Sequence, residues 1–185
     1  MAGDNSAHSL SETSDQILQR RADSLALEAV EEGVSDLLSL LLFRIGEEWY
    51  AVALDDVREI FQEYQVTTIP CVPEFILGVV NVRGEILSVT DPARLMGIGV
   101  IEIGDAVKPP AIVVTDEETA TAIVVDEIGD ITDVARGAIE PPVSIIDRSQ
   151  AEFVSGSVFV DGTMVGLINV ERVLEPIGGN GRHDR

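Results

Sequence analysis

The amino-acid sequence predicts an all-β protein, built either as β-barrels or as a sandwich. Hydrophobic residues make up 45% of the chain and aromatic residues only 4%, so aliphatic side chains dominate. Short apolar runs recur along the sequence and are separated by turn-forming residues, which is typical of strands joined by tight turns. Few segments show a long helical period. At 185 residues, the chain is long enough for one sizeable domain or for two small subdomains that share a core.

The N-terminal segment has a helical pattern. Residues 1–12 are small and polar, and we expect them to be disordered. Residues 13–16 match the Thr-x-x-Gln capping box, in which each side chain bonds the free backbone N–H of the other residue. An apolar stripe with steps of three and four residues follows and ends before Gly33; it consists of Leu18, Ala22, Leu25 and Ala29. This amphipathic helix is expected to pack on its own domain, or to dock on a partner or a second copy.

From Leu38 onward the pattern changes to strands. Residues 40–45 and 49–53 predict two strands around a turn at 46–48. Residues 54–61 carry apolar side chains at helical spacing behind two aspartates, which predicts a helix. Further strands are expected at 66–69, 78–83, 85–90, 111–115, 121–128, 143–146, 153–160 and 163–170. A closing helix is expected at 171–177.

A short helix is expected directly after the strand 85–90. Asp91 can accept hydrogen bonds from the free backbone N–H groups of the first turn. Pro92 stands at the first helical position, where a missing N–H is harmless. Residues 97–110 then have the composition of a loop.

The residues that most enzymes need are missing or misplaced. The two histidines, His8 and His183, lie in polar end segments, which argues against a histidine base or a zinc site. The sequence has no nucleotide-binding glycine loop followed by a helix and no serine nucleophile elbow. Asp126, Asp130 and Asp133 are spaced too widely for an EF-hand loop. We therefore expect a non-enzyme without catalytic residues, metal or cofactor.

The net charge of −21 limits the kinds of partner. An acidic surface repels phosphate backbones and anionic lipids, so we expect no nucleic-acid binding and no direct membrane insertion. The longest apolar run, 37–43, is too short to cross a bilayer, and no secretory signal is visible, which predicts a cytoplasmic protein. Cys71 is the single cysteine; its apolar neighbours predict a buried thiol.

Residues 78–91, Gly-Val-Val-Asn-Val-Arg-Gly-Glu-Ile-Leu-Ser-Val-Thr-Asp, are the most informative part of the chain. They form two alternating apolar runs hinged at Arg83 and Gly84, which predicts a hairpin with Gly84 in a turn conformation that a β-carbon disfavours. Asn81 and Arg83 have a spacing of two and are expected on the same face of a strand. This pair indicates a presented surface or a bracing ion pair, and it fits equally well the solvated face of an ordinary strand.

The motif Gly-x-x-Asn-x-Arg-Gly resembles the central signature of the CheW family, the coupling proteins of bacterial and archaeal chemotaxis. Other parts of the chain add to the resemblance in the right order, namely 41–52, 57–60, 69–77, 86–91, 122–128 and 166–170. The resemblance implies two SH3-like five-stranded β-barrel subdomains packed together, with short helices and an extra N-terminal amphipathic helix.

The resemblance also implies a domain organisation. The CheW-like domain is expected at 38–175, with a seam between the subdomains near 90–110 and terminal strands that cross between the barrels. Residues 1–37 would then be an N-terminal extension, a disordered tail plus the amphipathic helix. Residues 176–185 would be a flexible C-terminal tail.

The resemblance further implies which residues meet partners. Glu59 and Arg83 match charged positions linked to receptor and kinase coupling, and an ion pair between them would brace the expected helix against the strand. Val57 matches an apolar position implicated in partner binding. Three more positions are associated with receptor contact on strands lining a groove between the barrels, namely Ala111, Ala122 and Ile131. Asn81 completes the candidate set.

The function expected from this resemblance is a non-catalytic adaptor that couples chemoreceptors (methyl-accepting chemotaxis proteins) to the histidine kinase CheA. One barrel face would pair with the regulatory domain of CheA, and the groove would accept the cytoplasmic tip of a receptor as a helix. The protein would be recruited to membrane-associated receptor arrays. Two alternatives stay open: a coupling protein of a non-motility pathway, such as development or type IV pilus control, and a ligand-binding β-barrel.

Overall fold

The computed structural model describes residues 36–104, 108–142 and 148–178. The chain divides into two units, Met1–Leu37 and Leu38–Arg185, and the fold below is that of the second unit. The helix expected after residue 13 and the strand expected at 143–146 lie outside the described residues.

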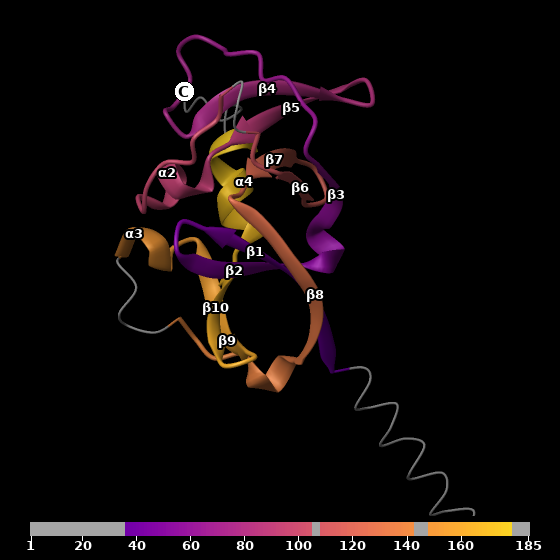
Figure 1. Cartoon of the computed structure of the whole chain (residues 1–185), viewed down its shortest axis with the longest axis vertical. Helices are drawn as coiled ribbons and strands as arrows, with labels where there is room; N and C mark the ends of the chain where they lie inside the picture. Colours follow the sequence, from indigo (N-terminus) through magenta and orange to yellow (C-terminus); the bar gives the residue numbers. More distant parts are fainter. Residues whose placement is uncertain (1–35, 105–107, 143–147, 179–185) are drawn as a thin grey trace, which may run out of the picture. The chain divides into compact units, whose positions relative to one another are not determined.

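The described residues form two five-stranded sheets, which confirms the predicted all-β fold with two subdomains (Figure 1). The first sheet has the order β8-β1-β2-β10-β9, with β1 (Leu37–Ile45), β2 (Glu48–Ala53), β8 (Glu127–Ala135), β9 (Val154–Val160) and β10 (Thr163–Ile168). The second sheet has the order β3-β6-β7-β5-β4, with β3 (Val57–Phe61), β4 (Ile76–Val82), β5 (Glu85–Thr90), β6 (Ala111–Thr115) and β7 (Ala120–Val124).

Short helices connect and cover the sheets in the described part of the chain. They are η1 (Leu54–Asp56), α2 (Pro92–Met96), η2 (Arg136–Ala138), α3 (Arg148–Ala151) and α4 (Val170–Gly178). The last of them, α4, lies between the two sheets in Figure 1 and buries Val173 and Leu174. It matches the closing helix predicted at 171–177.

The core explains why β1 is apolar on both faces. Leu41, Phe43 and Ile45 belong to a large cluster that also contains side chains of the second sheet and of α4. Leu40 and Leu42 point the other way, into a smaller cluster formed with β2, β9 and β10. A strand that is covered on both faces has a continuous apolar sequence, because polar side chains are disfavoured on either face.

The predicted seam near residues 90–110 is wrong, because β5 and β6 lie on either side of it and belong to the same sheet. The chain leaves the first sheet after β2, through η1, and returns to it between β7 and β8. The second sheet is therefore one continuous insertion between two strands of the first. The first and last strands of the described chain, β1 and β10, both belong to the first sheet, so the terminal strands that the resemblance implied to cross do not pass from one sheet to the other.

The helix predicted at 54–61 is also wrong beyond its first turn. Residues Leu54–Asp56 form a single 3-10 turn, and Val57–Phe61 form β3, which pairs with β6. Along β3, Val57, Glu59 and Phe61 are half-buried while Arg58 and Ile60 are exposed, so burial alternates with a period of two. The β-branched and aromatic residues of this segment favour a strand once a neighbouring edge is available.

Strand β8 was not predicted as a separate element. The sequence predicted a single strand at 121–128, but β7 ends at Val124 and β8 begins at Glu127 in the other sheet. A β-carbon on Gly129 would lie 2.7 Å from the ring of Trp49, so glycine lets the indole pack against this strand. The expected strand at 66–69 is reduced to one bridge between Thr67 and Val79.

The helix cap at Asp91 is confirmed. Its carboxylate is fully buried and accepts hydrogen bonds from the backbone N–H groups of Ala93 and Arg94, with Pro92 at the start of the helix. The second carboxylate oxygen accepts from the N–H of Ile101, so one side chain fixes both α2 and the loop after it. Cys71, in contrast, is exposed and not buried, because it sits in a turn with a positive φ of 62°.

Candidate interaction surface

The β4–β5 turn has a defined geometry that starts from its sequence. Val82 pairs with Glu85, so Arg83 and Gly84 form a two-residue turn with φ values of 51° and 92°. The positive φ of Gly84 confirms the prediction made for it. The side-chain oxygen of Asn81 accepts a hydrogen bond from the Gly84 N–H at 2.9 Å. Asn81 therefore fixes the turn, and Arg83 belongs to the turn and not to a strand face.

Arg83 forms the ion pair that the sequence suggested. Its Nε atom lies 3.3 Å from a carboxylate oxygen of Glu59, and the arginine side chain is 85% exposed against 22% for the glutamate. Glu59 lies on β3, so the pair joins a strand to the β4–β5 turn where a helix was expected. An exposed pair of this kind contributes only about 0–1 kcal/mol to stability. The guanidinium is thus held in place while most of it stays accessible.

A second ion pair joins the same two elements. Arg58, beside Glu59, lies 3.0 Å from a carboxylate oxygen of Glu85 at the start of β5. In the second sheet β3 is one edge strand, and the hairpin of β5 and β4 lies at the other edge, so both pairs join one edge of the sheet to the hairpin at the other. Arg58 and Glu85 were not among the predicted site residues, although the opposite charges at 58–59 and 83–85 are a signal that could have identified them.

A shallow hollow of about 320 Å³ opens beside Arg83. It is lined by residues of β3, β4 and the segment after β3, namely Glu59, Ile60, Phe61, Glu63, Tyr64, Val80, Asn81, Val82 and Arg83. The rings of Phe61 and Tyr64 meet edge to face, with centroids 5.3 Å apart, and the Tyr64 hydroxyl donates to the backbone oxygen of Pro109. Partial burial raises the pKa of Tyr64, which keeps its hydroxyl protonated. Arg83 and Glu59 thus stand at the rim of a mixed apolar and acidic surface.

The other predicted site residues are not gathered at this surface. Ala111 and Ala122 are fully buried inside the second sheet, so their side chains cannot touch a partner in this structure. Ala111 pairs with Phe61 and can only shape the surface from beneath. Val57 is half-buried and packs against the core. Ile131 is 58% exposed, but it lies on β8 of the first sheet, beside a separate hollow.

The groups available at the surface around Arg83 are suited to binding a protein partner. Among the residues that the structure describes, no group of three or more histidine, cysteine, aspartate or glutamate side chains is placed to hold a metal ion. In the same residues, no helix is long and apolar enough to cross a membrane. A rigid turn, a half-exposed apolar strand and one accessible guanidinium are features of a protein-binding surface.

Comparison with known proteins places this geometry in a family. The family model of the CheW-like domain matches residues 39–177, which is most of the chain. The chain belongs to the CheW-like family. The matched region begins at β1 and ends in α4, so it contains both sheets and the candidate surface. CheW-like proteins are the coupling adaptors of chemotaxis, and this is the function that family membership gives the chain.

Individual CheW-like relatives agree with this assignment. The probable chemotaxis protein CheW of Rhizobium etli is 30% identical over 80% of this chain and 92% of its own length. The protein FrzA of Myxococcus xanthus is 28% identical over 72% of this chain and 82% of its own length. The crystal structure of the scaffolding protein TtCheW from Thermoanaerobacter tengcongensis superposes with a TM-score of 0.66 at 29% identity, covering 80% of this chain and 97% of that one.

Proposed function

We propose that this CheW-like protein is a non-catalytic adaptor that couples the cytoplasmic tips of chemoreceptors to the regulatory domain of the histidine kinase CheA. It acts in the cytoplasm, recruited to membrane-associated receptor arrays. Membership of a family of chemotaxis coupling proteins supports this proposal. The contact residues are Val57, Glu59, Asn81, Arg83 and Ile131, with Ala111 and Ala122 shaping the surface from inside the second sheet.

The observation that carries the proposal is the exposed guanidinium of Arg83, which is braced by Glu59 and held on a turn fixed by Asn81. A side chain that is already positioned loses less conformational entropy when it binds. The adjoining hollow and the exposed side chain of Ile60 supply apolar area for a receptor helix. In an array of many copies, weak contacts of this kind act together through effective concentration.

One alternative is kept within the same family. FrzA, a relative whose name does not refer to chemotaxis, also matches most of the chain. The same surface would then couple a receptor to a kinase in a pathway other than motility, such as development or type IV pilus control. Neighbouring genes distinguish the two, since motility genes favour the first and pilus or developmental genes favour the second.

The test is receptor-dependent activation of the kinase in a reconstituted mixture of receptor, CheA and this protein. Arg83→Ala is expected to reduce activation by about fivefold or more, the effect of losing a central interface arginine. Its melting temperature should stay within about one degree of the wild type, because exposed ion pairs add little stability. Arg172→Ala is the matched control, since Arg172 also forms an exposed ion pair, with Glu175 at 2.6 Å on α4. Wild-type activation by Arg83→Ala would contradict the proposal.

Exchanging the charges of Glu59 and Arg83 distinguishes two roles of Arg83, namely direct contact with the partner and support of the turn through the ion pair. In the double variant Glu59→Arg/Arg83→Glu the ion pair is restored in the opposite direction. If the guanidinium meets the partner, this variant stays as inactive as Arg83→Ala. Recovery of activation would show that the pair only supports the turn.

A further inference from the structure

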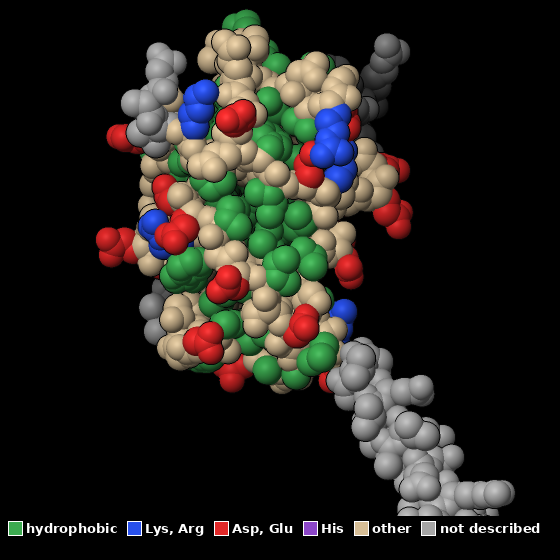
Figure 2. Space-filling view, turned by 45° about the vertical axis from the view of Figure 1, so that its right-hand side comes forward, with side chains coloured by type: hydrophobic (Ala, Val, Ile, Leu, Met, Phe, Trp, Pro, Cys, Tyr) green, Lys and Arg blue, Asp and Glu red, His purple; other side chains and the backbone are tan. Residues whose placement is uncertain are grey.

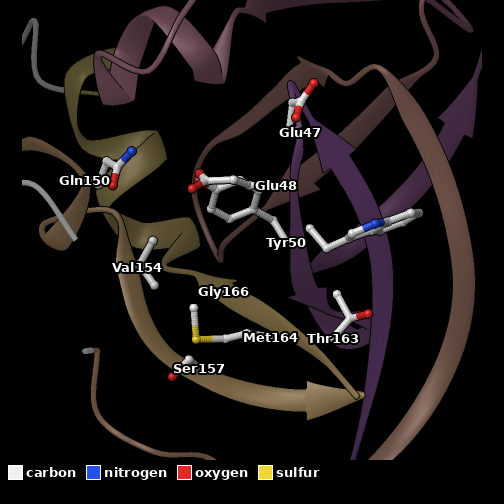
Figure 3. A pocket seen from close by; sticks show the side chains of 10 residues that line it. Glu47, Glu48, Tyr50, Gln150, Val154, Ser157, Thr163, Met164 and Gly166 are labelled. Carbon is white, nitrogen blue, oxygen red and sulfur yellow. The ribbon is translucent and has the colours of Figure 1, made fainter. Parts of the chain in front are cut away.

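A further concave site lies on the first sheet, away from the Arg83 surface. It is a pocket of about 210 Å³ between β2, β9, β10 and α3, shown in Figure 3. Its walls are mostly apolar, from Tyr50, Val154 and Met164. In Figure 3 the Glu48 carboxylate points toward Gln150, and Glu47 lies apart from it at the turn before β2. Small-molecule sites usually measure about 300–1,000 Å³, so this pocket has room for a single side chain.

The Glu48 carboxylate is positioned by the fold. Tyr50 is buried, its ring stacks on Phe43, and its hydroxyl donates to a carboxylate oxygen of Glu48 at 2.7 Å. A β-carbon on Gly166 would lie 3.1 Å from the Tyr50 ring, so glycine at this position lets the ring lie against β10. Burial, followed by the hydrogen bond and charge of Glu48, raises the pKa of Tyr50 well above its ordinary value. The hydroxyl therefore remains a donor at any physiological pH.

The pocket offers carboxylates that can meet a partner. Ser157 also lines it, but it adds no orphaned group, because in the described part of the chain no buried side-chain nitrogen or oxygen lacks a hydrogen-bond partner. Within the same residues, neither Glu47 nor Glu48 forms an ion pair.

From these features we propose that the pocket binds an arginine side chain of a partner protein. The guanidinium carries one positive charge and five N–H donors in a plane, which lets it bond the Glu48 carboxylate through charge-assisted hydrogen bonds. Its aliphatic stem fits between Val154 and Met164, because arginine buries its methylene groups against apolar surface. The net charge of −21 attracts a basic segment to the protein before it docks. The proposal does not depend on the role of Arg83.

The test uses two peptides and NMR titration of the isotopically labelled full-length protein. The probe is Ac-Gly-Leu-Arg-Leu-Gly-NH₂, and its control is Ac-Gly-Leu-Gln-Leu-Gly-NH₂. We expect saturable shifts with the arginine peptide, confined to the amides of residues 47–50, 154–157 and 163–166. The glutamine peptide should bind about tenfold more weakly or not at all, because charge-assisted hydrogen bonds are lost.

Variants distinguish the pocket from general attraction to an acidic protein. Glu47→Gln/Glu48→Gln should weaken binding of the arginine peptide by about threefold or more. The matched control is Glu117→Gln/Glu118→Gln, which removes the same two charges from another exposed turn and should leave binding unchanged. Equal weakening by both glutamate pairs, shifts spread over the whole surface, or equal binding of the two peptides would each overturn the proposal.

Discussion

At the scale of single residues, glycines with the same sign of φ serve different purposes. Gly84, with a φ of 92°, has no atom within 4 Å of where its β-carbon would be, so the turn needs it for backbone conformation alone. Gly78, with a φ of 146°, would place a β-carbon 2.3 Å from the backbone oxygen of Thr67. Here glycine is required by the close approach of another segment, which pairs with β4 at Val79.

Replacing Gly84 by valine tests the turn. A β-branched residue at positive φ is strained by about 1–2 kcal/mol, so Gly84→Val should lower the urea midpoint of unfolding. Gly84→Asn should lower it less, because asparagine tolerates this conformation. An unchanged midpoint for Gly84→Val would show that the turn relaxes freely. The measurement is equilibrium urea denaturation followed by circular dichroism.

The sequence could predict Gly84 and not Gly78, for a physical reason. The turn is local, and the two residues between alternating apolar runs are enough to require a positive φ. The contact between Gly78 and Thr67 depends on where another segment passes, which no local pattern contains. The ion pair between Glu59 and Arg83 is not local either, and it was expected from the resemblance to the CheW family and not from a local pattern. The burial of Ala111 and Ala122 depends on the closure of the sheet.

At the scale of elements, the sequence identified most strands but misassigned those whose period was ambiguous. Residues 54–61 satisfy helical spacing through Leu54, Val57 and Ile60, and they also satisfy alternation through Val57, Glu59 and Phe61. The available edge of β6 decides in favour of the strand. In contrast, α2 was predicted correctly because its capping aspartate and its proline are both local signals.

Asp91 caps the N-terminal end of a helix of only five residues, yet it should contribute more to the free energy of unfolding than such a short helix suggests. Asp91→Ala removes a cap and leaves buried N–H groups without partners, which costs about 2–4 kcal/mol. Asp116→Ala is the control, since Asp116 also accepts two backbone hydrogen bonds, from Glu118 and Thr119, but lies in an exposed turn. Urea denaturation should show a clearly larger loss for Asp91→Ala. Equal losses would mean that burial of the Asp91 carboxylate adds nothing to the cap.

At the scale of the whole molecule, the net charge governs how stability depends on salt, and the sheet topology governs the order of folding. Acidic residues outnumber basic ones by 33 to 12. Figure 2 shows red carboxylates scattered over the visible face around green apolar side chains, with few blue cations. Like charges at this density repel one another, and compaction of the chain brings them closer. Composition alone predicts this property, because it does not depend on the fold.

Salt should therefore stabilise the protein. Screening lengths fall from about 14 Å at 50 mM to about 3 Å at 1 M salt, so the melting temperature should rise by several degrees between these concentrations of NaCl. A near-neutral protein of similar size provides the control for general salt effects. A melting temperature that stays constant or falls would show that the ion pairs, which salt weakens, outweigh the repulsion.

The position of the second sheet inside the first has a consequence for the order of folding. The second sheet is formed by one continuous stretch of chain, whereas β1 must find β8 across a long separation, as in the Arg44–Glu127 pair, 83 residues apart. Closing a long flexible loop costs entropy before any contact forms. We therefore expect amides of β6 and β7 to become protected before those of β1 and β8 in pulsed hydrogen exchange during refolding. Once the second sheet has formed, its two chain ends hold β2 and β8 close together. A change that slows formation of the second sheet should therefore also slow assembly of the first sheet. Protection of β1 and β8 first would contradict this order.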